Sequence, residues 1–557
     1  MKYRLTLVCA SLLIGFSSIS AQISKNDTTL NRTVIVEREY NPIIQGTTKV
    51  NVLPKVDEPN ITPKKVEYDV APVQPKSYSV ALVNPMVAPE LEKLPKLGYV
   101  RLGYGNHGNL DARAHYTYLI TPQDRLTFDF TSYGLSGKLD DYYNEQNKKW
   151  NSFYYRTFGS LAYEHKFDAA VLKFNAGYKV NNFNFANFDK TIIPRVDELT
   201  MASKQRFNAG NFGVGVKSTD NDLLIKYDVM SEFMIYQRQF DFVNSKLKES
   251  SLNTTAKLIT NLDEDNAIGL DLNMYNRVVS TSDMKNSTTF DMNPYYGLSL
   301  ANWKFRLGAH IDLGFGHGES FLVSPDVSAE LTVANDYMLY AKATGGRIKS
   351  DFSRMEVLSP YTMIDSNIRD AYEHLNATLG FKGSPVAGLW FNAFVGYQKL
   401  KDDLYQEINI QDFPVTVFGN DDTKNGYLGA KMQYKYKKLF DVSVSGVYRN
   451  WSAKNEDTGA ILFKPKFELE TDISTMPIRG LLVGLNYKYV KREENKELDP
   501  ALFVGTINKL SAYATYEFVK NLSVYAKMDN IFNKKYQYFY GYPIEGTNFI
   551  AGLSFKF

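Results

Sequence analysis

Apolar and polar residues alternate throughout residues 97–557, in segments of about ten residues. The segment from Leu522 to Met528 is typical, because every second residue is apolar and Lys527 lies among the polar residues between them. Successive side chains of a strand point to opposite faces, so such segments predict strands with one apolar and one polar face. A lysine in mid-strand is costly against lipid but not against water, so the polar faces are expected to line an aqueous interior.

The connections between these segments alternate in length. Tight turns are predicted at 121–124, 167–169, 219–222, 263–266, 301–302, 335–336, 384–387, 437–439, 474–480 and 519–521. Longer connections lie between them, among them 138–151, 187–203, 346–371, 399–425, 492–508 and 530–546. Short turns on one side and long loops on the other are typical of transmembrane barrels. Ten turns join twenty strands, and one more strand at each end makes about 22. The sequence thus predicts an all-β, closed antiparallel transmembrane barrel over residues 97–557, with both termini periplasmic.

The first residues predict export. Lys2 and Arg4 precede an apolar run, and small residues follow it up to Ala21, which is the pattern of a secretory signal peptide over residues 1–21. With the barrel, this indicates the cell outer membrane. Cys9 is the only cysteine and lies inside this segment, which excludes disulfides and thiolate metal sites from the mature chain.

Residues 22–96 differ from the rest of the chain, because they hold nine of its 20 prolines. Such a segment cannot bury a sizeable core, and we expect an extended Pro-rich arm in the periplasm or the lumen. Its one strand-like stretch consists of Thr33, Val34, Ile35, Val36, Glu37, Arg38 and Glu39.

The C-terminal segment Met528–Tyr536, MDNIFNKKY, is followed by Gly541-Tyr542-Pro543 and a last strand that ends in Phe557. This ending resembles that of TonB-dependent receptors, which close with an N-[LI]-F-[ND]-x-x-Y segment, a loop with Gly and Pro, and an aromatic-ending strand. Two weaker echoes are Tyr397–Asp402 and the stretch Arg354–Tyr361, which resembles a loop of these receptors with an N-P-Y-type turn. The resemblance covers residues 97–557 by architecture and about 30 residues by motif.

The resemblance implies a transport barrel, and it implies that the stretch 33–39 is a TonB box. For this stretch the favoured interpretation is nevertheless a strand-like part of an extended arm. The chain departs from the family in one respect: only residues 22–96 precede the barrel, where the receptors have a full plug domain. The last strand is also similar to the strand that the outer-membrane assembly machinery recognises. Its apolar face consists of Phe549, Ala551, Leu553, Phe555 and Phe557.

Signals for catalysis are weak. The six histidines lack metal-site spacing, and the glycine-rich stretch Gly314–Ser320 lacks the endings of a phosphate loop or a nucleophile elbow. We therefore predict no enzyme, no metal site and no cofactor. Balanced charge, with 62 basic and 61 acidic residues after the signal peptide, gives no reason to expect nucleic-acid binding.

Two further loop features have alternative interpretations. Acidic pairs at 140–141, 402–403 and 421–422 either bind cations or simply solvate loops, and the second is favoured. Loop aromatics suit a saccharide or protein ligand, or they form the interfacial girdle of a barrel, which is favoured. These aromatics are Tyr142, Tyr143, Trp150, Phe352, Tyr361, Tyr536, Tyr538, Phe539 and Tyr540.

The lumen of a 22-stranded barrel is wide and leaks unless something fills it. The arm, inward-folding loops or a partner are the candidates. The favoured hypothesis is an occluded barrel that takes part in transport across the outer membrane with TonB. The alternative is a non-transporting scaffold of an assembly or secretion complex, with a lipoprotein or second barrel as partner.

Overall fold

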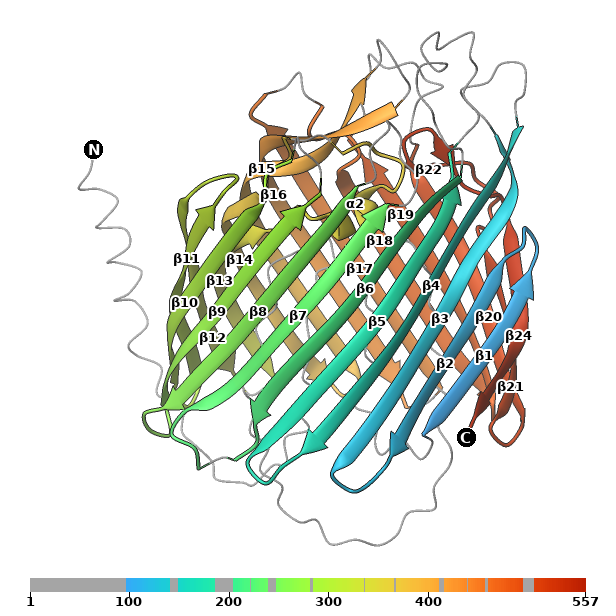
Figure 1. Cartoon of the computed structure of the whole chain (residues 1–557). Helices are drawn as coiled ribbons and strands as arrows, with labels where there is room; N and C mark the ends of the chain where they lie inside the picture. Colours follow the sequence, from blue (N-terminus) through green and yellow to red (C-terminus); the bar gives the residue numbers. More distant parts are fainter. Residues whose placement is uncertain are drawn as a thin grey trace, which may run out of the picture. The chain divides into compact units, whose positions relative to one another are not determined.

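A computed structural model of the chain describes the barrel and most of its connections (Figure 1). The described residues are 97–140, 149–185, 204–220, 222–238, 247–280, 284–334, 336–364, 367–409, 415–437, 439–455, 459–493 and 505–557. The expected signal peptide, the arm 22–96 and the TonB-box-like stretch 33–39 lie outside them.

The described chain is built almost entirely of long antiparallel strands. In chain order the elements are β1 Gly98–Gly105, β2 Leu110–Leu119, β3 Asp124–Asp140, β4 Lys149–Lys166, β5 Ala170–Asn184, β6 Lys204–Ser218, β7 Lys226–Arg238, β8 Lys248–Asn261, β9 Asn266–Val279, β10 Ser287–Ser299, β11 Trp303–Phe315, β12 Phe321–Val333, β13 Tyr337–Ile348, α2 Phe352–Leu358, β14 Ala371–Val386, β15 Leu389–Asn409, β16 Val415–Tyr436, β17 Phe440–Ala453, β18 Pro465–Ile478, β19 Leu481–Arg492, β20 Ile507–Val519, β21 Leu522–Asp529, β22 Gln537–Phe539, β23 Tyr542–Pro543 and β24 Asn548–Lys556.

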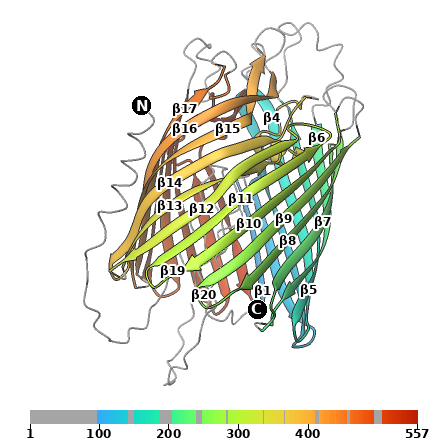
Figure 2. The same cartoon turned by 90° about the vertical axis from the view of Figure 1, so that its left-hand side faces the viewer.

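Twenty-two of these strands form one closed ring, and each pairs with its neighbours in sequence. The ring closes where β1 pairs with β24, with Tyr99 opposite Lys556 and Gly105 opposite Ile550. Gly98 and Phe557 exchange two backbone hydrogen bonds of 2.9 Å at the end of this seam. The predicted 22-stranded antiparallel barrel is confirmed (Figures 1 and 2).

The ten predicted tight turns all coincide with connections between strands, with small shifts. The turn predicted at 474–480 narrows to Arg479 and Gly480, because β18 runs on to Ile478. The long connection predicted at 399–425 is wrong, because β15 and β16 extend through most of it as a hairpin. A register shift between Leu400 and Asp403 lets this hairpin bend, and Figure 1 shows it leaning over one end of the barrel.

The two faces of the strands follow the predicted alternation. On β24, Leu553 is 53% exposed, whereas the neighbouring Ser554 is only 3% exposed. Large apolar side chains are exposed on nearly every strand, among them Leu102, Phe212, Leu307, Leu379 and Leu428. Such an apolar outer surface on a closed barrel fits the hydrocarbon core of a bilayer. Separately, no helix within the described ranges is long and apolar enough to cross a membrane.

One long connection folds into the barrel rather than away from it. We call its described residues, 349–364 and 367–370, the lumenal loop; it joins β13 to β14 and contains α2. The helix begins after Asp351, whose side chain accepts a 2.8 Å hydrogen bond from the backbone N–H of Arg354. It ends at Leu358, and the next residue, Ser359, is extended and directly precedes Pro360, which cannot continue a helix. Figure 1 shows α2 within the ring of strands, close to the end that bears the long loops.

Candidate functional site

The lumenal loop packs on the inner wall of the barrel through apolar side chains. Phe352 and Met355 of α2 are each 1% exposed and belong to one buried cluster with residues of the wall. The wall contributes Leu139, Trp150, Phe183, Phe185, Phe207, Tyr236 and Val279, and the β15–β16 hairpin contributes Leu404 and Phe418. A membrane barrel has a polar interior as a rule, so this apolar cluster at one end of the lumen marks a place where the loop is held.

Tyr361 links the lumenal loop to the connection before the last strand. Its ring stacks on the ring of Tyr542 of β23, with 3.6 Å between the centroids and an interplanar angle of 10°. Edge contacts with Phe183 and Phe539 follow at 5.2 and 5.5 Å. Burial raises the pKa of Tyr361 well above its usual value, so its hydroxyl remains neutral at physiological pH.

A buried carboxylate lies at the centre of the contact. Glu356 of α2 has no exposed side-chain surface, and its Oε1 accepts a 2.8 Å hydrogen bond from Asn181 Nδ2. Its Oε2 accepts hydrogen bonds from Lys179 Nζ at 2.9 Å and from the Tyr236 hydroxyl at 2.8 Å. Arg156 Nη2 lies 3.8 Å from Oε1.

The charge state of Glu356 follows from these partners. Burial by itself raises the pKa of a carboxyl group, but the charges of Lys179 and Arg156 and the hydrogen bonds from Lys179 and Tyr236 act in the opposite direction. The net effect lowers the pKa of Glu356 below its usual value. The carboxylate is therefore ionised, and it neutralises cations that the wall holds away from water.

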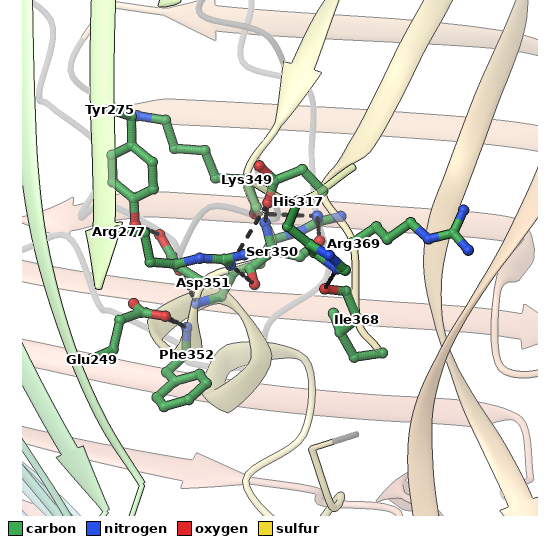
Figure 3. Close-up of polar contacts among 12 residues, drawn as sticks. Glu249, Tyr275, Arg277, His317, Lys349, Ser350, Asp351, Phe352, Ile368 and Arg369 are labelled. Atoms are coloured by element: carbon green, nitrogen blue, oxygen red, sulfur yellow. Dashed lines mark hydrogen bonds and ion pairs between the residues drawn. The ribbon is translucent and has the colours of Figure 1, made fainter. Parts of the chain in front are cut away.

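The beginning of the lumenal loop is fixed by polar residues of β8 and β9 (Figure 3). Arg277 Nη1 donates a 2.9 Å hydrogen bond to the Ser350 carbonyl oxygen, and the Ser350 N–H donates to Asp370 Oδ1 at 2.8 Å. The Phe352 N–H points at the Glu249 carboxylate at 3.3 and 3.4 Å. Both ends of the loop, Ser350 and Asp370, thus meet at one arginine.

The second half of the loop pairs with the β15–β16 hairpin. The Met363 N–H donates to the Thr416 carbonyl oxygen, and the Phe418 N–H donates to the Met363 carbonyl oxygen, both at 2.9 Å. The hydroxyls of Thr362 and Thr416 lie 2.7 Å apart. Farther along, His317 Nε2 lies 3.1 Å from the Ile368 carbonyl oxygen (Figure 3). The loop is therefore held between the wall of β3–β9 and the hairpin.

The structure corrects the favoured interpretation of several loop aromatics. Trp150, Phe352 and Tyr361 lie in the interior cluster rather than in an interfacial girdle. Tyr536, Phe539 and Tyr540 also pack in the last connection and its surroundings. Strand alternation does not extend into loops, so nothing in the sequence told these residues apart from girdle residues. Tyr142 and Tyr143 lie outside the described residues.

The acidic pairs in the hairpin have protein partners. Asp402 lies 3.4 Å from Arg369 Nη1, Asp403 is paired with Lys464, and Asp422 lies 3.4 Å from Lys454 Nζ. Within the described part of the chain, no three His, Cys, Asp or Glu side chains come together as a metal site. The residues that sequence reasoning missed are Glu356 and its wall partners. The sequence does contain one signal for the wall partners, because Lys179 and Asn181 are two positions apart and therefore lie on the same face of β5.

Comparison with known proteins gives a fold and no close relative. No family model matches the chain, and no curated protein sequence matches it significantly. Among solved structures, the FrpB iron transporter from Neisseria meningitidis (F3-3 variant) has a TM-score of 0.65 and 11% identity, over 83% of this chain and 81% of that one. This is the barrel fold of TonB-dependent receptors. The copper transporter OprC gives a TM-score of 0.61 at 13% identity, over 83% of this chain and 82% of that one.

A third similar structure is that of the ferric-catecholate import receptor Fiu from E. coli K12. It has a TM-score of 0.59 and 9% identity, over 84% of this chain and 82% of that one. The first two of these structures are named as transporters and the third as an import receptor. Identities of 9 to 13% establish the fold of the barrel and leave the cargo to be inferred from this chain's own residues.

Proposed function

We propose that this protein is an outer-membrane transport barrel whose lumen is closed on the side of the long connections by its own lumenal loop, and that TonB opens it through the stretch 33–39. The observation that carries the proposal is the Glu356 contact, since a loop held by a buried ion cluster is a specific structure rather than a loosely packed connection. The likeness to transport barrels supports the same function.

The contacts between the lumenal loop and the wall allow the loop to close the lumen and also to leave the wall. The hydrogen bonds of Glu356 join α2 to residues 120 to 177 positions away in sequence, so they break together when the loop leaves the wall. Buried charges cost several kcal/mol each to desolvate, which limits the net gain from pairing them. The loop is thus specifically placed without being held irreversibly.

Removal of the loop tests the closure. Replacement of residues 351–368 by a short Gly–Ser linker is expected to raise the single-channel conductance of the purified protein in planar bilayers. It should also make cells permeable to large antibiotics that an intact outer membrane excludes. The substitution Glu319→Ala, which breaks an exposed pair with Lys401, is the matched control and should leave both readouts unchanged. Equal conductance of the loop-deleted and native barrels would refute closure by the loop.

The TonB step has a separate test. A TonB box adds a strand to its partner through backbone hydrogen bonds, and proline cannot donate one. Val36→Pro is therefore expected to abolish co-purification of the C-terminal domain of TonB and to leave barrel assembly intact, whereas Val36→Thr should retain both. A stoichiometric lipoprotein or barrel partner that co-purifies without TonB would instead support the scaffold alternative.

A further inference from the structure

The groups that surround Glu356 belong to the barrel wall. Arg156 comes from β4, Lys179 and Asn181 from β5, and Tyr236 from β7. Arg156 stands directly opposite Asn181 in the β4–β5 register, so these side chains share the lumenal face. The wall therefore keeps this group of donors whether or not the lumenal loop is in place.

We propose that these four residues form a binding site for the carboxylate of a ligand, and that Glu356 occupies this site in the closed barrel. We call the four residues the carboxylate pocket. The inference rests on the proposed function, because a ligand reaches the pocket only when the loop has left the wall. It adds the chemical class of the ligand: an organic carboxylate with an apolar or aromatic group beside it.

The geometry selects a planar, two-oxygen anion. Asn181 and Arg156 face one carboxylate oxygen, and Lys179 and Tyr236 face the other. Charged donors to a carboxylate form the stronger class of hydrogen bond, and here two cations converge on a single anion. A neutral amide in the same place would leave both cations without a counter-charge.

Glu356 does not satisfy the pocket completely. The distance from Arg156 Nη2 to Glu356 Oε1 is 3.8 Å, which is beyond a hydrogen bond. Arg156 Nε is buried and has no hydrogen-bond partner among the described residues. A ligand whose carboxylate sits deeper, or which has a hydroxyl beside it, can use these donors and thereby compete with Glu356.

The surroundings of the pocket define the rest of the ligand. Phe183 opposes Tyr154 across the β4–β5 pairing, and the rings of Phe183 and Phe207 lie 5.1 Å apart in an edge contact. Phe183 and Phe207 are 0% and 5% exposed beneath the loop, and both belong to the wall. Departure of Phe352 and Tyr361 with the loop would uncover these rings, which favour an apolar or aromatic group next to the carboxylate.

Competition for one pocket couples binding to opening. A ligand that occupies the carboxylate pocket excludes Glu356, so it binds the open state and shifts the barrel toward it. The loop would thus open to a ligand of the correct chemistry and remain closed to others. Removal of the Glu356 carboxylate should create a vacancy that a small free carboxylate can fill.

Chemical rescue on the purified full-length protein tests the pocket. We use Glu356→Ala, with phenylacetate as the probe and phenylacetamide as its neutral isostere. The expected result is a rise in the melting temperature of Glu356→Ala with phenylacetate only, because a ligand stabilises the state that binds it. Phenylacetate should bind Glu356→Ala with an apparent Kd about tenfold lower than it binds Glu319→Ala. This factor of ten corresponds to about 1.4 kcal/mol. The double variant Glu356→Ala/Lys179→Met should lose this response.

Three results would overturn the assignment: equal stabilisation by phenylacetamide, an equal response of Glu319→Ala, or a response that persists in the double variant. If Glu356→Ala does not assemble, Glu356→Gln retains the shape of the side chain and should show the same preference for phenylacetate. The measurement needs neither TonB nor a membrane. A protein that binds phenylacetate but does not transport would therefore retain the pocket and refute only the proposed function.

Discussion

Replacement of Tyr361 by alanine should release the lumenal loop from the wall. Tyr361 is 8% exposed, stacks on Tyr542 at 3.6 Å and meets Phe183 at 5.2 Å. Truncation of a buried aromatic residue to alanine costs about 3–5 kcal/mol in folded proteins. Because Tyr361 lies on the loop and its partners lie elsewhere, we assign this loss to docking of the loop. At about 1.4 kcal/mol for each factor of ten, a loss of about 3 kcal/mol raises the released population about 100-fold.

Cysteine labelling can measure that population. The only cysteine of the chain, Cys9, lies in the expected signal peptide, so a single introduced cysteine reports one position. Met355 lies on α2 of the loop itself and is 1% exposed while the loop is docked, which makes Met355→Cys a reporter of release. Tyr361→Ala in this background should accelerate maleimide labelling about 100-fold, in proportion to the released fraction.

The control is Phe305→Ala, which breaks an aromatic stack with Trp303 at 5.3 Å on β11, a strand that contributes nothing to the loop's apolar cluster. It should leave the labelling rate unchanged. Equal acceleration by both substitutions would mean that Met355→Cys reports loosening of the whole barrel. No acceleration by Tyr361→Ala would mean that the Tyr361–Tyr542 stack does not hold the loop.

Two further predictions concern the strand faces and pH. Phe233→Arg places a cation against lipid near the middle of β7, at a cost of about 2–4 kcal/mol, and should reduce the amount of heat-resistant assembled barrel on semi-native gels. Met230→Arg lies on the opposite face near Asp228 and Glu232, and this variant should assemble normally. Equal defects in the two variants would contradict the assignment of the faces. The lowered pKa of Glu356 means that its ionised form stabilises docking above the usual value of 4.5 and that this contribution disappears as pH falls through the lowered pKa. A change in Trp150 fluorescence below about 4.5 should therefore occur in the native protein and be absent from Glu356→Gln, whereas the same acid transition in Glu356→Gln would contradict this role of the carboxylate.

The barrel was predictable from the sequence because its signals are local. Turn residues such as those at 263–266 and the alternation along Leu522–Met528 depend only on near neighbours, and both coincide with a turn and a strand of the structure. The hairpin of β15 and β16 was misread because its stretch Gly419–Gly426, GNDDTKNG, has the composition of a loop. Its strands are held by pairing of Leu400 with Thr423 and of Asp403 with Asp421, which composition does not reveal.

The lumenal loop was not predictable for the opposite reason. Glu356 meets Lys179 and Asn181 across 177 and 175 residues, and no local pattern encodes such a pairing. Inward-folding loops were among the candidates for filling the lumen, but nothing singled out residues 349–370. The likeness of Arg354–Tyr361 to a receptor loop gives no role to the carboxylate within it, because that role depends on partners far away in the sequence.

The seam between β1 and β24 has a consequence for how the protein is made. Tyr99 and Lys556 face each other across it, so the ring has no closed form until β24 has been synthesised. Until then the growing sheet has two unpaired edges, each a template for aggregation with another chain. Pairing β1 with β24 also costs conformational entropy, and this cost rises only slowly with the number of residues between the two strands. Loss of β24, Asn548–Lys556, would therefore leave an open sheet with two exposed edges rather than a slightly smaller barrel, and cellular quality control would treat it as an unfinished chain.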